Sequence, residues 1–190
     1  MKVIFLVVLL LLTEGGIAET KPGQTPSSGN PYSNVALGFS YVPPTEMNDE
    51  TKSGRAEIRA RAAARHTSNT LGLLLSMSSG PDATSADWHL LSIETYPRQK
   101  FSNLDDISAE TNMSAWVAGF SSSTGKPRSV VLAGQSFAVS VFSEQDGAIK
   151  KGAVVWTTVR KDKLLSFAFV ANSPEQLKRL AETMKSVKFF

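Results

Sequence analysis

Four arginines within eleven residues form the densest set of side chains that could bind a ligand. Arg55, Arg59, Arg61 and Arg65 lie in the segment 54–66, which is otherwise rich in alanine. Guanidinium groups form paired hydrogen bonds with carboxylates and phosphates. The segment therefore predicts a surface for an anionic ligand, such as phosphate, a carboxylate or an anionic lipid, or for an envelope protein. The alternative is an exposed charged helix that covers a sheet edge, because runs of charge are usually solvated surface.

The residues needed for catalysis are scarce in this chain. It contains two histidines, His66 and His89, and no cysteine. A nucleophilic serine needs a base and an orienting acid, and a metal site needs several ligands. We therefore expect a non-enzymatic protein with no catalytic residue, cofactor or metal. The alternative is an envelope hydrolase that uses His89 with a nearby serine or a carboxylate such as Glu94.

The start of the chain predicts export. Lys2 precedes the unbroken apolar run Val3–Leu12, and small residues lead up to Ala18. This pattern is typical of a secretory signal peptide over residues 1–18, with cleavage near Ala18. The alternative is an uncleaved membrane anchor. We expect a secreted or periplasmic protein of bacterial origin, whose membrane contact is limited to the signal peptide before cleavage.

The composition predicts one globular domain after a short leader. Of the 190 residues, 42% are hydrophobic and 19% are charged, which is ordinary for a folded domain. Residues 19–36 are rich in Pro, Gly, Ser, Thr and Asn, so we expect a flexible leader there and a single domain over 37–190. The net charge of +3 is too small to indicate nucleic-acid binding. The composition does not determine the oligomeric state.

Hydrophobic periodicity predicts strands and helices over most of the domain. The apolar run at 70–78 favours a central strand buried on both faces. Gly134–Gln135 is expected to bend or bulge the chain between two strands. Ser173 is expected to cap the last helix, in a capping box completed by Gln176. The expected strands are 37–42, 70–78, 88–96, 129–133, 137–143, 153–159 and 164–171, and the expected helices are 54–66, 103–120 and the segment that follows Ser173.

This order of elements predicts an α+β fold, specifically an α/β/α-type sandwich with one mostly antiparallel sheet and helices packed on it. The early aromatic strand Gly38–Pro43, a central helix, a meander and a closing helix that ends in Val187–Phe190 resemble the Mog1/PsbP-like fold family. The chain departs from that family in its arginine-rich stretch and in lacking a tryptophan soon after Pro43. The resemblance implies a binding or assembly module with no shared catalytic residues.

Overall fold

The computed structural model describes residues 30–64, 71–97, 120, 125–146 and 149–190. The predicted signal peptide lies outside the described residues, as does the predicted helix at 103–120 apart from Phe120. Phe120 is buried. The last part of the predicted leader is described.

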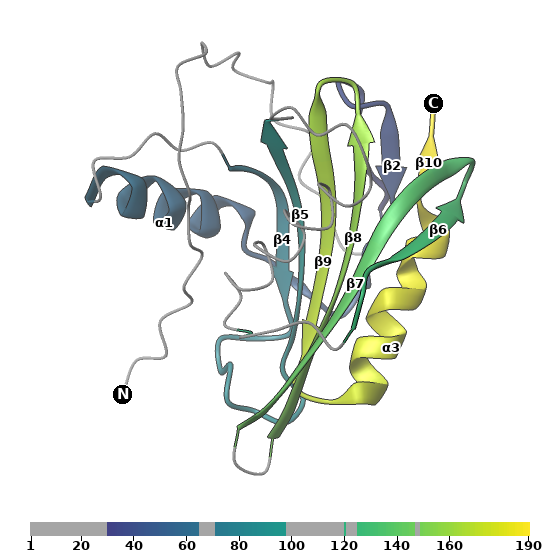
Figure 1. The fold of residues 1–190 in the computed structure, drawn as a ribbon. Helices are drawn as coiled ribbons and strands as arrows, with labels where there is room; N and C mark the ends of the chain where they lie inside the picture. Colours follow the sequence, from purple (N-terminus) through teal and green to yellow (C-terminus); the bar gives the residue numbers. More distant parts are fainter. Residues whose placement is uncertain (1–29, 65–70, 98–119, 121–124, 147–148) are drawn as a thin grey trace.

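A seven-stranded antiparallel sheet forms the body of the protein (Figure 1). Its three longest neighbouring strands form the predicted meander, because side chains alternate between two faces and short turns join the strands. This part of the prediction is confirmed. In sheet order the strands are β3 (Asn48–Asp49), β4 (Gly72–Ser78), β5 (His89–Pro97), β9 (Lys163–Ala171), β8 (Ile149–Arg160), β7 (Gln135–Asp146) and β6 (Arg128–Leu132).

The chain reverses between β6 and β7, where a bend or bulge was predicted. Leu132 pairs with Gln135 across a two-residue loop. The two loop residues have positive φ, 49° at Ala133 and 74° at Gly134. A tight hairpin turn of this length needs positive φ at both central residues, which glycine adopts easily. The prediction of a bend was wrong because the alanine gave no signal for such a turn.

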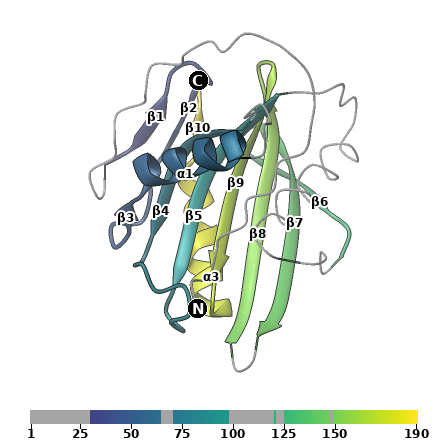
Figure 2. The ribbon, with the colours of Figure 1, turned by 90° about the vertical axis from the view of Figure 1, so that its left-hand side faces the viewer.

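A second, three-stranded sheet corrects the prediction of one sheet (Figure 2). It contains β1 (Tyr32–Asn34), β2 (Phe39–Tyr41) and β10 (Lys188–Phe189), and β2 pairs with both neighbours. β1 lies inside the segment predicted to be a flexible leader. Residues 32–34 form a strand because Tyr32 is buried, with 2% of its surface exposed, and β2 supplies a pairing partner.

Arg160, at the end of β8, ties the large sheet to the loop before β2. Its Nε donates to the carbonyl oxygen of Leu37 at 3.1 Å, and its Nη2 donates to that of Gly38 at 3.0 Å. The guanidinium also lies over the ring of Phe189, 4.8 Å from its centre. One side chain thus joins β8, the β2 loop and β10.

The last helix, α3 (Pro174–Glu182), continues into the 3-10 turn η1 (Thr183–Ser186) and packs on β8 and β9. Ser173 accepts a hydrogen bond from the backbone N–H of Gln176, so the predicted N-cap is confirmed. In a capping box the Gln176 side chain would also accept a hydrogen bond from the backbone N–H of Ser173, and this second bond is replaced. The Gln176 amide instead donates to the carbonyl oxygen of Asp87 at 3.2 Å, because the loop before β5 lies within its reach.

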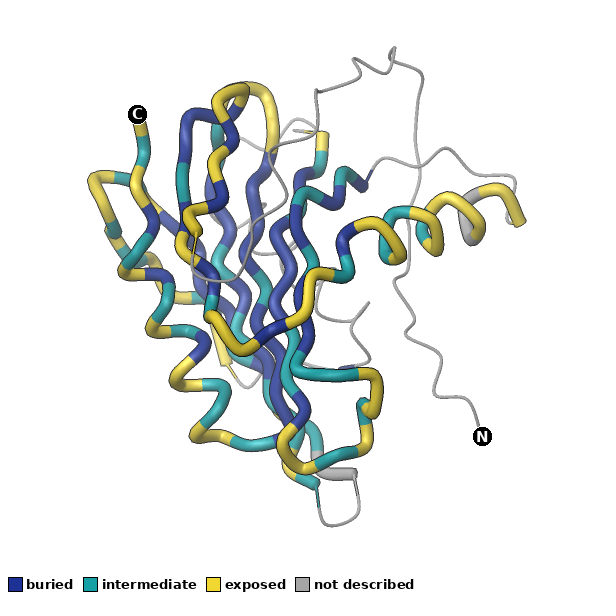
Figure 3. The backbone as a smooth tube through the Cα atoms, turned by 180° about the vertical axis from the view of Figure 1, so that it is seen from behind, coloured by how far each residue is buried: buried dark blue, intermediate teal, exposed yellow. Residues whose placement is uncertain are grey.

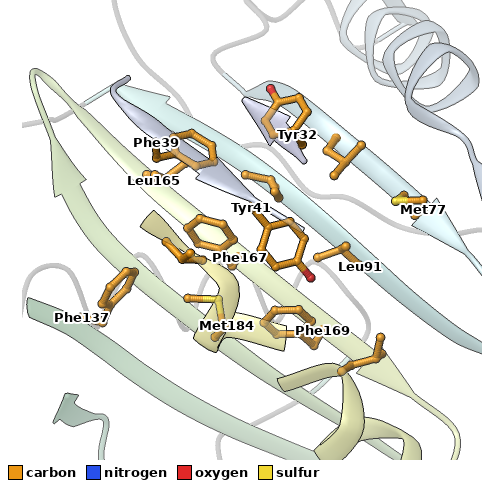
Figure 4. Close-up of a cluster of buried hydrophobic side chains, with 14 of the residues drawn as sticks. Tyr32, Phe39, Tyr41, Met77, Leu91, Phe137, Leu165, Phe167, Phe169 and Met184 are labelled. Carbon is orange, nitrogen blue, oxygen red and sulfur yellow. The ribbon is translucent and has the colours of Figure 1, made fainter. Parts of the chain in front are cut away.

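The main core lies between the two sheets and α3 (Figure 4). Phe167 of β9 is at its centre and is fully buried. Its ring contacts those of Phe39, Tyr41 and Phe137 at centroid distances of 5.6, 5.9 and 6.4 Å. Aromatic contacts therefore hold β2 against β7 and β9.

β4 is not the central strand that its composition predicted. It lies next to the sheet edge, and its side chains alternate between buried and partly exposed. Of the helices, α3 covers one face of the large sheet, whereas α1 (Thr51–Ala64) meets the sheet at the β4 edge. The α+β class is confirmed. The predicted α/β/α layering is not confirmed by the described residues.

Candidate functional site

The first turn of α1 is fastened to the edge of the large sheet. Thr51 Oγ1 accepts a hydrogen bond from the backbone N–H of Ser76 at 2.9 Å and donates to its carbonyl oxygen at 3.4 Å. The backbone N–H of Glu50 donates to the same oxygen at 2.8 Å. These bonds replace the neighbouring strand that β4 lacks at this point, so α1 starts at a fixed place on the edge.

Arg55, one turn further along α1, also binds the edge of β4. Its Nε donates to the carbonyl oxygen of Leu73 at 2.8 Å, and its Nη2 donates to that of Leu74 at 3.0 Å. The β4–β5 register shifts between Leu73 and Leu75, which is a β-bulge. A bulge leaves backbone groups without ladder partners. The guanidinium of Arg55 satisfies two such carbonyls and is therefore part of the fold.

The rest of α1 projects away from the sheet and is largely exposed (Figure 3). Arg59 is exposed, and its side chain has no hydrogen bond or ion pair with any residue that the structure describes. Arg61 lies in the same helix, although its side chain is outside the described residues, as is Arg65 altogether. Ile58, the only large apolar side chain in α1, is partly buried.

The structure therefore separates the four predicted site residues. The guanidinium of Arg55 faces the sheet edge and is hydrogen-bonded to it, whereas the side chain of Arg59 is exposed. The first turns of α1 cover a sheet edge, as the second alternative predicted for the whole segment, and a ligand surface on the remaining arginines stays a prediction. The sequence does not distinguish Arg55 from Arg59, because both lie in the same alanine-rich segment.

His89 and Glu94 do not form a catalytic pair. They are five residues apart in β5, and successive strand residues point to opposite faces, so their side chains lie on opposite sides of the sheet. His89 is at the strand's first position, where its Nδ1 lies 2.9 Å from the carbonyl oxygen of Asp87. The described residues therefore give no geometric support to the hydrolase alternative built on this pair.

Glu94 belongs to a hydrogen-bonded group on the face of the large sheet opposite the one that α3 covers. Its carboxyl group accepts hydrogen bonds from Ser92, at 2.9 Å, and from the hydroxyl of Tyr96. Burial raises the pKa of the Glu94 carboxyl, and the bonds from Tyr96 and then Ser92 partly oppose that rise. The three residues alternate along β5, so a series of polar side chains at every second position was the sequence signal for this group.

Polar side chains continue across the neighbouring strands. Glu94 is paired with Ser166 of β9, which is paired with Thr157 of β8. The hydroxyls of Ser166 and Thr157 lie 2.9 Å apart, and both residues are buried. Ser140 on β7 is 1% exposed, and its hydroxyl has no hydrogen-bond partner among the residues that the structure describes. This polar row holds hydroxyls and one carboxyl, without a histidine to activate a serine.

Glu94→Gln is expected to make stability less sensitive to pH. The folded-state pKa of Glu94 is raised, so ionising this group costs folding energy as pH rises from the unfolded-state pKa through the folded-state pKa. Glutamine cannot ionise, so the variant should gain stability relative to the natural protein over that window, by about 1.4 kcal/mol per pKa unit. Urea unfolding between about pH 4 and pH 8 measures the difference.

Tyr96→Phe is the matched opposite change. It removes a hydrogen bond that lowers the Glu94 pKa, so the stability of this variant should fall more steeply with rising pH than that of the natural protein. Parallel pH profiles for the natural protein and Glu94→Gln would show that folding does not change the ionisation of Glu94.

Among the described residues, no three His, Asp or Glu side chains come together in a way that could hold a metal ion. Within the same residues, none of the helices combines the length and the apolar character needed to cross a membrane.

The fold is shared with a protein of known structure. CyanoP, the cyanobacterial PsbP of Synechocystis, matches with a TM-score of 0.54 over 92% of this chain and 100% of its own, at 13% identity. The chain has a PsbP-like fold. The Mog1/PsbP-like fold predicted from the sequence is thereby confirmed. At this identity the PsbP-like fold alone is shared, and the likeness assigns no ligand.

Two further solved structures are more distant. LpqN, involved in cell envelope biogenesis of Mycobacterium tuberculosis, has a TM-score of 0.47 and 11% identity, over 90% of this chain and 86% of its own. A Bacteroides thetaiotaomicron protein has a TM-score of 0.47 and 12% identity over 80% of this chain, which spans 45% of that protein. No protein-family model and no curated protein matches the chain.

Proposed function

We propose that this protein is a non-enzymatic binding or assembly module of the cell envelope, secreted or periplasmic after removal of residues 1–18. Its partner is an acidic segment of another envelope protein, which binds the exposed turns of α1. The observation that carries the proposal is a cationic helix that projects from the body, on which the exposed side chain of Arg59 has no partner among the described residues. The PsbP-like fold supports a binding role, because the resemblance to this family implies modules without shared catalytic residues.

The charge and exposure of α1 favour an acidic partner. The helix contains four cationic residues, Lys52 and three arginines, against the single acidic residue Glu57. It has no acidic residue in its first turn, where a negative charge would favour the helix dipole. A short helix that buries little apolar surface gains little stability from packing. Carboxylates bound to its arginines would offset the excess charge and add contacts.

An anionic membrane surface fits α1 less well than an acidic protein segment. Helices that lie in a membrane interface insert large apolar side chains such as Trp, Phe or Leu. In α1 the exposed positions between the cations are two alanines, a serine and a glutamate, and the one larger apolar residue, Ile58, is partly buried. The helix can therefore offer charge to a lipid surface but little apolar area.

The test uses a fluorescent peptide of eight glutamates as the acidic probe. Arg59→Gln should weaken its binding about threefold, the equivalent of one exposed ion pair, and Arg59→Glu should weaken it further. Binding to the natural protein should also weaken between about 50 and 200 mM salt, because exposed charges are screened. Fluorescence anisotropy measures the dissociation constants.

Arg179→Gln is the matched control, since Arg179 is an exposed arginine on α3. It should leave binding unchanged. Equal losses in the two variants would mean that the peptide responds only to net charge, which would contradict a site on α1. Binding to phosphatidylglycerol vesicles in preference to the peptide would replace the acidic protein by a membrane surface.

A further inference from the structure

The two edges of the seven-stranded sheet are treated differently. The β4 edge is closed by the two residues of β3, by Thr51 and by Arg55. At the opposite edge, β6 pairs with β7 alone. No residue that the structure describes hydrogen-bonds to its outer side. Within the described part of the chain, β6 is therefore an edge strand whose outer backbone donors and acceptors have no partner (Figures 1 and 2).

β6 lacks most of the devices that prevent an edge from pairing with another chain. Natural edge strands are usually interrupted by a bulge or a proline, or carry inward-pointing charges. β6 pairs regularly with β7 over five residues and has no proline within it. Its one charge is Arg128, at the first position. Val131 is 69% exposed, so a large part of an apolar side chain faces solvent beside the free edge.

The charge pattern along this edge determines the kind of segment that fits it. Lys126 and Arg128 are exposed at its start, and Val131 is exposed near its end. A strand that adds in the antiparallel direction begins opposite Leu132 and ends opposite Arg128. Its first residues would therefore meet apolar side chains, and its last residue would meet a guanidinium.

A second copy of the protein is a poorer occupant. Five residues of strand extend about 17 Å. Pairing two such edges buries far less than the roughly 800 Å² per partner of a stable complex. Self-pairing would also set Arg128 against Leu132, which offers it no carboxylate. An extended peptide segment gains the same main-chain bonds and supplies the missing acid.

We infer that β6 is a docking strand for an extended segment of another protein, which adds antiparallel to it. The segment carries β-branched residues opposite Val131 and Val130 and a carboxylate opposite Arg128. This site lies across the sheet from α1 and does not depend on the function proposed for that helix.

The experiment uses the synthetic peptide acetyl-Thr-Val-Ile-Thr-Glu-amide, written in the order that places its glutamate opposite Arg128. Isothermal titration should detect micromolar to submillimolar binding. Val131→Lys should weaken binding about tenfold, because a lysine on an edge disfavours strand addition. Arg128→Glu should no longer bind the glutamate peptide and should bind the otherwise identical peptide that ends in lysine.

Several controls make the test decisive. Each variant should retain its melting temperature, since Val131 and Arg128 are exposed. The charge exchange at Arg128 keeps the test valid even where a β6 variant loses stability. Arg59→Gln should leave binding of this peptide unchanged, which separates failure of this inference from failure of the α1 proposal.

Three results would overturn the inference. The first is no binding at about 1 mM peptide, because a dissociation constant above that concentration is too weak for a docking strand. The second is equal binding of the reversed peptide, which would remove the antiparallel register. The third is a stable dimer in sedimentation that Val131→Lys dissociates, which would make a second copy the occupant.

Discussion

Replacing Phe167 with alanine is expected to lower the free energy of unfolding by about 3–5 kcal/mol, the usual cost of a buried Phe→Ala change. Phe167 has no exposed surface and contacts rings from β2 and β7. Its removal leaves a cavity where the two sheets meet and breaks three aromatic contacts at once. Chemical unfolding followed by tryptophan fluorescence measures the change, and the melting temperature should fall by roughly 6–20 °C.

Phe190→Ala is the matched control, because Phe190 is 66% exposed. It should change the free energy of unfolding by about 0.5 kcal/mol or less, as most surface substitutions do. Similar losses in both variants would show that Phe167 does not occupy the centre of the core.

Arg55→Ala is expected to lower the free energy of unfolding by about 2 kcal/mol. The substitution removes two hydrogen bonds from a charged group and leaves the carbonyls of Leu73 and Leu74 without their partner at the bulge. The loss corresponds to a fall of roughly 4–8 °C in melting temperature. Differential scanning calorimetry, together with chemical unfolding, measures both quantities.

Arg59→Ala provides the comparison for Arg55, since the two residues are one turn apart on α1. The side chain of Arg59 is exposed and has no hydrogen bond or ion pair with a described residue, so Arg59→Ala should change the free energy of unfolding by about 0.5 kcal/mol or less. Equal stability of the two variants would mean that Arg55 does not close the β4 edge in solution. Arg55→Lys should be intermediate, because an ammonium group lacks the planar fork that reaches both carbonyls.

These two arginines also determine how the candidate site should be mutated. A combined Arg55 and Arg59 substitution would mix a loss of folding with a loss of binding. Arg59 alone tests recognition, and Arg55 alone tests the sheet edge. The two arginines differ in role because Arg55 is hydrogen-bonded to β4. The sequence predicted one surface made of all four arginines.

The sequence by itself determined the elements whose signals are local. Alternating apolar residues predicted β7, β8 and β9, because a strand with one buried face requires a period of two. Ser173 and the apolar spacing after it predicted α3, because capping and helical periodicity act within a few residues. The resemblance to the Mog1/PsbP-like fold rested on the order of these elements, on the aromatic strand Gly38–Pro43 and on the ending Val187–Phe190.

Only the tertiary structure decided which residues meet across long separations in the chain. β1 forms a strand because β2 and the core accept Tyr32, although its own segment is polar and rich in turn formers. Arg55 is a structural residue because a bulge in β4 presents two carbonyls to it. The pKa of Glu94 is raised because its carboxyl group loses solvent on the face of the large sheet opposite α3, where the residue is partly buried. Each outcome depends on burial and partner geometry, which local sequence patterns do not encode.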